Sequence, residues 1–380
     1  MLETWFWVLV VVGLYPYVFY PVVLALLGKV LRRPVKRDDA HLPHVTVITA
    51  AYNEQAHIAA TVENKLSQDY PADKVDVIVV SDCSADRTDD IVGEIAARDP
   101  RVQLLRNATR SGKTMGLNLA IPRARGEIVV FADANSIYRP DAIRKLVRNF
   151  ADPKVGYVTG RMLYVDANGS LVGDGCSAYM KYENALRAAE TRVGSIVGVD
   201  GGVDAIRRAL YLPMRADQLP DFVTPLNVAE QGYRVIYEPD AVLTEDTLTE
   251  GSKEYRMRVR VSLRAFWALW DKRGLLNPFK HGLFAWQLWS HKLLRYLAFA
   301  PLAAALVINW ALLDHGAIYA LAAAGQVLFA LGCVAAGLGL GSWAPARYAF
   351  YFFLLNWASA VAFVRFLRGQ KQVLWQPRVG

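Results

Sequence analysis

Cysteine is scarce in this chain of 380 residues, which contains three, Cys83, Cys176 and Cys333. They are far apart and odd in number, so they have neither the spacing of a metal site nor that of a disulfide framework. Gly112-Lys113 lacks the rest of a phosphate-loop motif. The middle of the chain therefore reads as a protein of a reducing compartment, without a cysteine-held core or a phosphate-loop nucleotide site.

Charge is missing from a long segment at the N-terminus. Residues 5–29 carry no charge before Lys29, and about 20 such residues are enough to cross a bilayer. A secretory signal peptide fits poorly, because Glu3 stands where a basic start is expected and no small-residue cleavage site follows. We predict a transmembrane anchor over 1–31, kinked by its prolines.

A basic cluster follows this anchor, which places the next part of the chain in the cytoplasm by the positive-inside rule. Three further spans are predicted near the C-terminus, and an interfacial amphipathic segment before them. Three spans would put the tail outside, whereas its basic residues favour the inside, so the side of the tail stays open. The predicted segments are an interfacial region at 271–293, spans at about 294–313, 317–340 and 346–367, and a tail at 368–380.

The formal net charge of +8 is compatible with three kinds of binding partner: nucleic acid, anionic lipid or a phosphate-bearing substrate. Many of the basic residues flank apolar segments. That placement favours contact with membrane lipids, and we expect no nucleic-acid partner.

The middle of the chain alternates strands and helices. Apolar runs at 45–50, 74–82, 101–106 and 127–135 have the composition of strands, and helical stretches, among them 88–98, separate them. This alternation predicts an α/β fold with a mostly parallel, Rossmann-like sheet covered by helices.

Polar residues follow each of these strands, and in an open parallel sheet the strand ends form the ligand site. A single polar end is an ordinary loop or helix cap, but four in succession indicate one site. A sugar nucleotide would fit such a site, since carboxylates and amides bind the base and ribose, and a hard cation such as Mg²⁺ or Mn²⁺ binds the diphosphate. The four polar ends are Asn53-Glu54, Asp82, the loop at Lys113 and Asp133-Asn135.

Over about 44–270 the chain resembles family 2 glycosyltransferases, which have the GT-A nucleotide-sugar fold. The segments that carry the resemblance are "AAYNE" (50–54), "VVSDCSADRT" (79–88), "RSGKTMGLN" (110–118) and "DAN" (133–135). "DAN" takes the place of the family's Asp-x-Asp and departs from it by having an amide at its third position. The resemblance implies donor-nucleotide contacts at Ala51, Tyr52, Glu54, Asp82, Lys113 and Asp133, and a Mg²⁺ or Mn²⁺ site at Asp133 and Asn135.

Three later segments extend the resemblance. "VGVDGGVDAIRR" (197–208) is similar to the acceptor-side loop, which implies acceptor contacts at Gly201 and Gly202. Glu245 and Asp246 are either further acceptor residues or ordinary loop residues. In "LPDFVTPLN" a proline replaces the first acid of the catalytic pair, so the resemblance implies Asp221 as the base. The segment "EYRMRVRVSLRAF" keeps Arg260 of the Gln-x-x-Arg-Trp motif, at the leaving diphosphate, whereas Met257 and Val261 replace its Gln and Trp.

These residues also have ordinary structural interpretations. Asp82 and Asp221 could be helix N-caps, Lys113 could be a solvated surface lysine, and the basic run ending at Arg264 could face solvent or lipid. For Asp221, capping and catalysis are compatible.

The resemblance implies an inverting membrane glycosyltransferase with a cytoplasmic catalytic domain, similar to enzymes of the bacterial inner membrane. The expected donor is a UDP-sugar, and the expected acceptor is a carbohydrate or lipid-linked sugar in polysaccharide or oligosaccharide synthesis, with possible secretion-complex partners. One alternative is transfer of a single sugar to a membrane lipid. Another is a non-catalytic membrane subunit that binds nucleotides.

Overall fold

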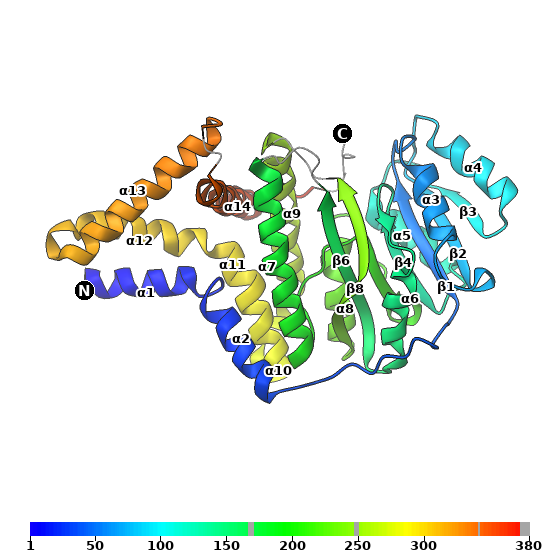
Figure 1. Ribbon diagram of the computed structural model, residues 1–380, viewed down its shortest axis with the longest axis horizontal. Helices are drawn as coiled ribbons and strands as arrows, with labels where there is room; N and C mark the ends of the chain where they lie inside the picture. Colours follow the sequence, from blue (N-terminus) through cyan, green and yellow to red (C-terminus); the bar gives the residue numbers. More distant parts are fainter. Residues whose placement is uncertain (166–170, 247–250, 341–342, 373–380) are drawn as a thin grey trace. The chain divides into compact units, whose positions relative to one another are not determined.

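The structure is a computed structural model that describes residues 1–165, 171–246, 251–340 and 343–372 (Figure 1). The chain divides into two units, and each is described by itself. The helical unit comprises Met1–Val30, Asp166–Leu186 and Thr247–Lys371, and the sheet unit comprises Leu31–Val165, Arg187–Asp246 and Gln372–Gly380. Helices α7 and α9, inside the segment 44–270 assigned to one domain from sequence, contribute to the helical unit, and the predicted domain boundaries stay a prediction.

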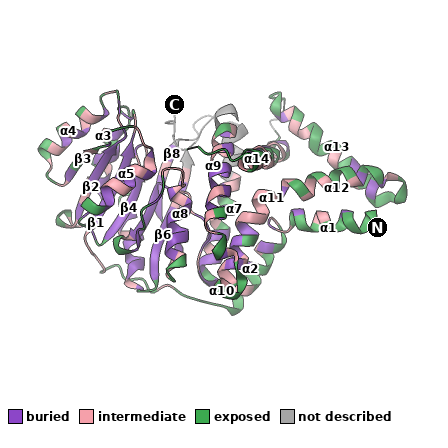
Figure 2. Ribbon diagram, turned by 180° about the vertical axis from the view of Figure 1, so that it is seen from behind, coloured by how far each residue is buried: buried purple, intermediate pink, exposed green. Residues whose placement is uncertain are grey.

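The sheet unit begins with four parallel strands that match the predicted ones. They are β1 (Val45–Ala51), β2 (Val75–Ser81), β3 (Val102–Arg106) and β4 (Ile128–Asp133), in the spatial order β3-β2-β1-β4. Every residue of β1 is buried, as expected for a parallel strand with both faces covered. Figure 2 shows β1, β2 and β4 mostly in the colour of buried residues.

Short amphipathic helices connect the four strands. In the first helix the buried residues Ile58, Thr61, Val62 and Lys65 recur at helical spacing and form one face. The helices of this part are α3 (Ile58–Leu66), α4 (Thr88–Arg98), α5 (Lys113–Ala120) and α6 (Ala142–Val147), with 3₁₀ turns at Ala72–Lys74, Ile121–Arg123 and Arg148–Ala151. The strand–helix alternation predicted from sequence is therefore confirmed.

Four more strands extend the sheet beyond β4, and the sequence analysis did not anticipate them. They are β7 (Val203–Arg207), β6 (Val155–Val165), β8 (Arg234–Asp246) and β5 (Ile137–Tyr138), in that spatial order. Strand β7 runs antiparallel to both neighbours, whereas β6 and β8 are parallel. A 3₁₀ turn at Arg208–Leu210 and helix α8 (Pro220–Glu230) connect β7 to β8. The segment 197–208 is consequently a loop only as far as Gly202, and continues as β7.

The helical unit begins with two short helices, α1 (Leu2–Leu14) and α2 (Phe19–Val30). Their axes are bent by 57°, at a break that contains Pro16, which lacks the N–H that a continuous helix needs. The remaining helices are α7 (Leu171–Val193, which ends in the sheet unit), α9 (Gly251–Asp271), α10 (Pro278–Gln287), the π-helix η6 (Leu288–Leu293), α11 (Leu294–Leu297), α12 (Phe299–Ala311), α13 (Ala317–Gly337) and α14 (Ala344–Leu367), with 3₁₀ turns at Arg273–Leu276 and Leu313–His315.

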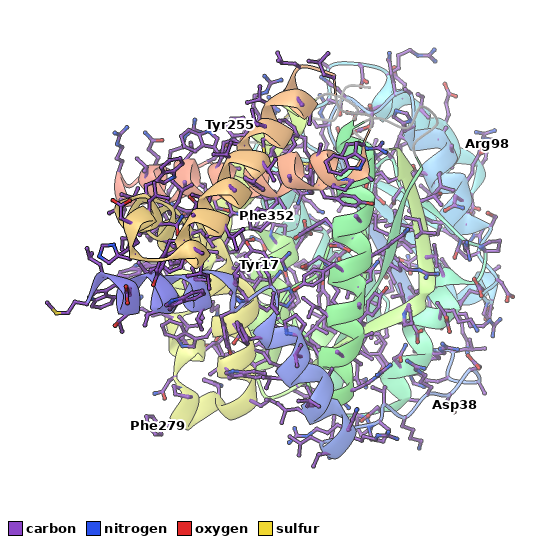
Figure 3. All side chains as sticks on the ribbon, turned by 60° about the vertical axis from the view of Figure 1, so that its left-hand side comes forward. Tyr17, Asp38, Arg98, Tyr255, Phe279 and Phe352 are labelled. Carbon is purple, nitrogen blue, oxygen red and sulfur yellow. The ribbon has the colours of Figure 1, made fainter. Side chains whose placement is uncertain are left out.

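In the described part of the chain, α13 and α14 are each long and apolar enough to cross a membrane. The bent pairs α1–α2 and Pro278–Leu297 with α12 raise the number of candidate spans to as many as four, if each pair crosses as one. The predicted spans at 294–313, 317–340 and 346–367 coincide with α11–α12, α13 and α14. Aromatic contacts hold this unit together, as at Tyr17 and Phe352, whose ring centroids are 5.2 Å apart (Figure 3).

Candidate active site

The carboxyl ends of three neighbouring strands meet at one edge of the sheet. The register pairs Ala50 of β1 with Asp133 of β4, and Ala51 with Ser81 at the end of β2. The chain then turns sharply after β1 and β2, since Asn53 and Cys83 have φ values of 54° and 61°. This edge therefore collects the polar residues that the sequence analysis assigned to the donor site.

Asp82, directly after β2, organises the loop that leads to α5. Its buried carboxylate accepts hydrogen bonds from Asn107 Nδ2 (2.7 Å) and from the backbone N–H groups of Ser111 (2.7 Å) and Gly112 (2.8 Å). The N-cap position of α4 belongs to Arg87, so the interpretation of Asp82 as the cap of that helix is wrong. Its contact with the nucleotide base stays a prediction.

Lys113, the first residue of α5, joins two acids from distant parts of the sequence. Its Nζ donates to Asp133 Oδ1 (2.8 Å) and to Asp221 Oδ1 (3.1 Å). Burial would lower the pKa of Lys113, but the charges of Asp133 and Asp221 outweigh that effect and raise it. Lys113 is thus a charged link between β4, α5 and α8 rather than a solvated surface lysine.

Asp221 lies in the first turn of α8, where the helix dipole favours a carboxylate. The N-cap residue is Leu219, so the N-cap interpretation of Asp221 is wrong. The backbone of Gly201 and Gly202 passes close to the acids, with φ values of 85° and 77°. A Cβ at Gly201 would lie 2.8 Å from Asp221 Cγ, and one at Gly202 would lie 3.2 Å from Asp133 Oδ2. Both positions consequently need glycine, for conformation and for space.

More acids surround this group. Asn135 Nδ2 donates to Glu245 Oε1 (3.2 Å), which brings the tip after β4 to the end of β8. Burial, followed by the charges of Asp133, Asp86 and Glu245, raises the pKa of Glu54 to about 7. The predicted donor-site residue Tyr52 lies under the guanidinium of Arg110, with Cζ 3.8 Å from the ring centroid. The residues predicted at 51–54, 82, 113, 133–135, 201–202, 221 and 245 therefore all belong to the sheet unit.

Asp133 and Asn135 are the predicted ligands of a divalent cation. Within the described ranges, no group of three or more His, Cys, Asp or Glu residues could by itself hold a metal ion. Asp133 and Asn135 offer a carboxylate and an amide oxygen, which are donors that Mg²⁺ and Mn²⁺ accept. A cation here would therefore need further oxygens from a bound diphosphate, and the donor chemistry fits that arrangement.

Sequence reasoning missed a group of α3 side chains that hold the loop after β4. Lys65 Nζ donates to the Ser136 carbonyl (2.6 Å), Thr61 Oγ1 donates to the Ala134 carbonyl (2.7 Å) and Asn64 Nδ2 donates to the Tyr138 carbonyl (2.9 Å). Burial lowers the pKa of Lys65 to about 7, although the charge of Asp133 opposes this shift. The spacing of Thr61 and Lys65, one helical turn apart, was the available signal.

Asp204 was missed as well, although it lies within the quoted segment 197–208. It is fully buried in β7, near the Thr159 hydroxyl. Burial raises its pKa to about 8, with the nearby Thr159 hydroxyl opposing and the charge of Asp221 adding to the shift. The sequence shows only an acid between apolar residues, and its burial, which is rare for an aspartate, became visible in the structure.

Two predicted features fall outside this group. Arg260 lies on α9 in the helical unit, and its role at the diphosphate stays a prediction. The side chain of Asp246, the acid next to Glu245, lies outside the described residues.

Known proteins resemble this chain over the same region. Residues 46–201 match the model of the family described as "Glycosyl transferase family 2". A beta-monoglucosyldiacylglycerol synthase of Trichormus variabilis is 30% identical over 187 residues, 48% of this chain and 40% of the relative. A poly-beta-1,6-N-acetyl-D-glucosamine synthase of Staphylococcus aureus is 26% identical over 246 residues, 63% of this chain and 57% of the relative. The chain thus spans about half the length of these relatives.

A solved structure matches over nearly the whole chain. It is the mannosyltransferase PcManGT from Pyrobaculum calidifontis, in complex with GDP-Man and Mn²⁺. It is 26% identical, with a TM-score of 0.74 over 97% of this chain and 100% of the other. The predicted fold class is confirmed, and the part of the chain that matches the glycosyltransferase family 2 model is 46–201.

Proposed function

We propose that this protein transfers a sugar from a nucleotide-sugar donor to an acceptor hydroxyl, with inversion at the anomeric carbon. The observation that carries the proposal is the meeting of Asp133, Lys113 and Asp221, from three separate elements, at the carboxyl edge of the sheet. Ligands of open α/β sheets bind at this edge. The match to the family model over 46–201 supports the same reaction class.

Each acid has a distinct proposed role. Asp221 accepts the proton of the acceptor hydroxyl as general base. Asp133 and Asn135 hold Mg²⁺ or Mn²⁺ together with the donor diphosphate, and the cation supplies charge stabilisation for the leaving group. Lys113 moves between its two carboxylates and the donor phosphates, since its ammonium group lies between Asp133 and Asp221.

The donor is a UDP-sugar or a GDP-sugar. The sequence favoured UDP, whereas the similar mannosyltransferase was solved with GDP-Man. The carbohydrate acceptor expected from sequence is supported by the Staphylococcus aureus relative, a polysaccharide synthase. Transfer of one sugar to a membrane lipid is the second candidate, supported by the Trichormus variabilis relative and by the replacement of Gln and Trp at Met257 and Val261.

A donor and product screen tests the proposal. The full-length protein in detergent would receive UDP- and GDP-sugars, Mn²⁺ or Mg²⁺, and either oligosaccharides or a bacterial lipid extract. Release of the nucleotide diphosphate, with a new glycoside of inverted configuration in the mass and NMR spectra, is the expected result. A ladder of products would identify polymer synthesis, and a single glycolipid would identify the second candidate. Nucleotide binding without release from any donor would overturn the proposal in favour of a non-catalytic subunit.

A further inference from the structure

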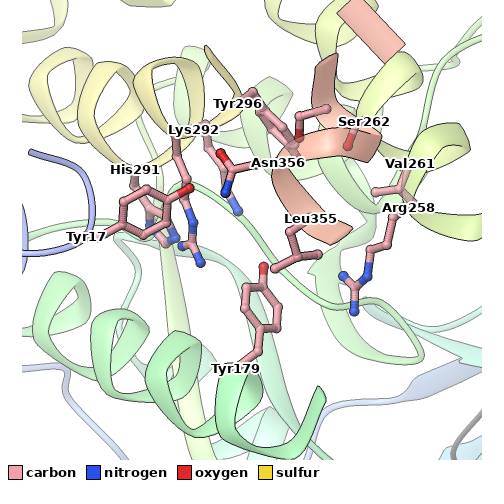
Figure 4. Close-up of a pocket in the computed structure, with 12 residues that line it drawn as sticks. Tyr17, Tyr179, Arg258, Val261, Ser262, His291, Lys292, Tyr296, Leu355 and Asn356 are labelled. Carbon is pink, nitrogen blue, oxygen red and sulfur yellow. The ribbon is translucent and has the colours of Figure 1, made fainter. Parts of the chain in front are cut away.

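The hydroxyl of Tyr138, a buried tyrosine of the sheet unit, bonds to the backbone at two places. Tyr179 and Tyr296 of the helical unit line a cavity (Figure 4). Tyr138, in contrast, is 2% exposed, and its hydroxyl donates to the carbonyl oxygens of Gly202 (2.6 Å) and Phe131 (3.0 Å). A hydroxyl has one hydrogen, so the shorter contact, with Gly202, is the principal bond.

Both carbonyl groups lie at the end of the ladder between β4 and β7. The last residue pair of this ladder is Ala132 with Val203. Asp133 directly follows this pair along the chain of β4, and Gly202 directly precedes β7. These two flanking residues are close, since a Cβ at Gly202 would lie 3.2 Å from Asp133 Oδ2. The Tyr138 hydroxyl therefore holds the backbone beside a proposed metal ligand.

The neighbour of Gly202 lies against the proposed base. A Cβ at Gly201 would lie 2.8 Å from Asp221 Cγ, so the carboxylate packs directly on this backbone. Lys113 bonds to both Asp221 and Asp133. Because the Asp221 carboxylate packs on the turn at Gly201-Gly202, a displacement of this turn would change its position relative to Asp133.

Helix α3 holds the other side of Tyr138. Asn64 Nδ2 donates to the Tyr138 carbonyl (2.9 Å), and Asn64 Oδ1 accepts from the Tyr138 backbone N–H (2.8 Å). Lys65 Nζ lies 3.9 Å from the centroid of the Tyr138 ring. Lys65 and Thr61 also donate to carbonyl groups of the loop between β4 and β5. One face of α3 thus fixes the backbone and the ring of Tyr138, and leaves its hydroxyl to hold Gly202.

We propose that Tyr138 is a positioning residue that links the metal-ligand loop after β4 to the turn at Gly201-Gly202. This inference rests on the proposed sugar transfer, in which Asp133 holds the cation and Asp221 accepts the proton. All the residues involved belong to the sheet unit. Small displacements of reacting groups lower rates strongly, so the loss of this link is expected to lower kcat.

A purely structural hydroxyl offers the matched comparison, since buried tyrosines usually find a hydrogen-bond partner wherever they lie. Tyr70 is 7% exposed, and its hydroxyl donates to the Pro43 carbonyl (2.6 Å). Pro43 comes just before β1, so this bond lies at the opposite end of that strand from the candidate site. The two tyrosines therefore make bonds of the same kind and length in the same unit, and only that of Tyr138 adjoins the acids.

Hydrogen–deuterium exchange tests the link without turnover. Tyr138→Phe and Tyr70→Phe each remove one buried hydroxyl from the full-length protein, and thermal unfolding in detergent confirms that both variants fold. Backbone exchange in the segment 197–204 should be about fivefold faster in Tyr138→Phe, the effect of one lost hydrogen bond on local opening. It should be unchanged in Tyr70→Phe. Wild-type exchange of this segment in Tyr138→Phe would overturn the proposal.

Activity then tests whether the link serves catalysis. We expect kcat for sugar transfer to fall about tenfold in Tyr138→Phe, the loss of one hydrogen bond in the transition state, and to keep its wild-type value in Tyr70→Phe. Equal kcat values in the two variants would overturn the positioning role. A wild-type protein that transfers no sugar from any donor would instead refute the proposed function, and the exchange measurement would still decide whether Tyr138 links the two segments.

A third variant tests the α3 side of the link. Thr61→Val keeps the shape of the side chain but removes the bond to the Ala134 carbonyl. Electron paramagnetic resonance of Mn²⁺ in the presence of UDP, or of GDP, should show binding weakened about tenfold, as is typical when a group that orients a metal ligand is lost. Tyr70→Phe is again the control and should bind Mn²⁺ like the wild type. Equal binding in Thr61→Val and Tyr70→Phe would show that α3 does not position the metal-ligand loop.

Discussion

Both units of this protein gather charged side chains, but with opposite balance. At the edge of the sheet, Lys113 stands among carboxyl groups and bonds to Asp133 and Asp221. In the helical unit, Glu183 stands among cations and contacts Arg295, His291 and Lys292. The carboxyl groups around Lys113 are donors that a metal ion accepts, whereas the cations around Glu183 stabilise a buried negative charge. The sign of the central charge therefore differs between the two clusters.

Burial separates the two clusters further. Asp133 and Asp221 have side chains that are 36% and 28% exposed, so a ligand can reach them and water screens their repulsion. The carboxylate of Glu183 is almost fully buried, so its charge depends on its partners. Substitutions in the first cluster are expected to lower mainly the activity, and substitutions in the second mainly the stability of the protein.

The largest expected effect is on activity in the sheet unit. Asp221→Asn removes the proposed base and should lower kcat for sugar transfer by about 10²-fold or more, with little change in thermal stability. Asp73→Asn, a change at an exposed acid of the same unit, is the control and should behave like the wild type. Wild-type kcat in Asp221→Asn would remove this residue from the mechanism.

The next effect is on stability in the helical unit. Burial by itself would raise the pKa of Glu183. The charges of Arg295 and His291 have a larger effect and hold this pKa well below its usual range. Glu183→Gln leaves buried cations without their counter-charge, so it should lower the free energy of unfolding by about 3–5 kcal/mol. Thermal unfolding in detergent measures this, with Glu3→Gln, at an exposed acid of α1, as the control. A shift no larger than that of Glu3→Gln would contradict the proposed difference between the clusters.

A smaller change sharpens the assignment of the metal donors. Chelator should abolish activity of the wild type, and Mn²⁺ or Mg²⁺ should restore it. Asn135→Asp adds a carboxylate ligand and should lower the half-saturating Mn²⁺ concentration about tenfold, because an ionised oxygen binds a hard cation more strongly than an amide does. The control is Asn277→Asp, at the exposed N-cap of α10. Activity that persists in chelator would exclude the cation.

A pH dependence of stability is expected from Asp204. Burial raises its folded-state pKa from 3.8 to about 8, so between these values the folded protein keeps a proton that the unfolded chain releases. Stability should therefore fall as pH rises from about 4 to 8 and level off above 8. Asp204→Asn should abolish this contribution. Thermal midpoints measured from pH 5 to 9 test it, and parallel curves for the two proteins would refute the raised pKa.

Much of the sheet unit followed from local sequence. The apolar strands at 45–50 and 127–135 end where β1 and β4 end, within two residues, and the predicted helix 88–98 coincides with α4. The strands β5 to β8 were missed, because an antiparallel strand such as β7 pairs with residues far away in sequence. Asp204 and Lys65 escaped notice for the same reason: their importance depends on burial by distant elements.

The sequence by itself determined the class of fold, the polar strand ends and the apolar helices, because these depend on the chemistry and spacing of neighbouring residues. The tertiary structure decided the partners of each charge. In the folded chain Asp82 bonds to the loop before α5, and Lys113 bonds to both Asp133 and Asp221. Glu183 pairs with Arg295 of the helical unit. Such pairings join residues up to 112 positions apart, and only chain folding brings them within hydrogen-bonding distance.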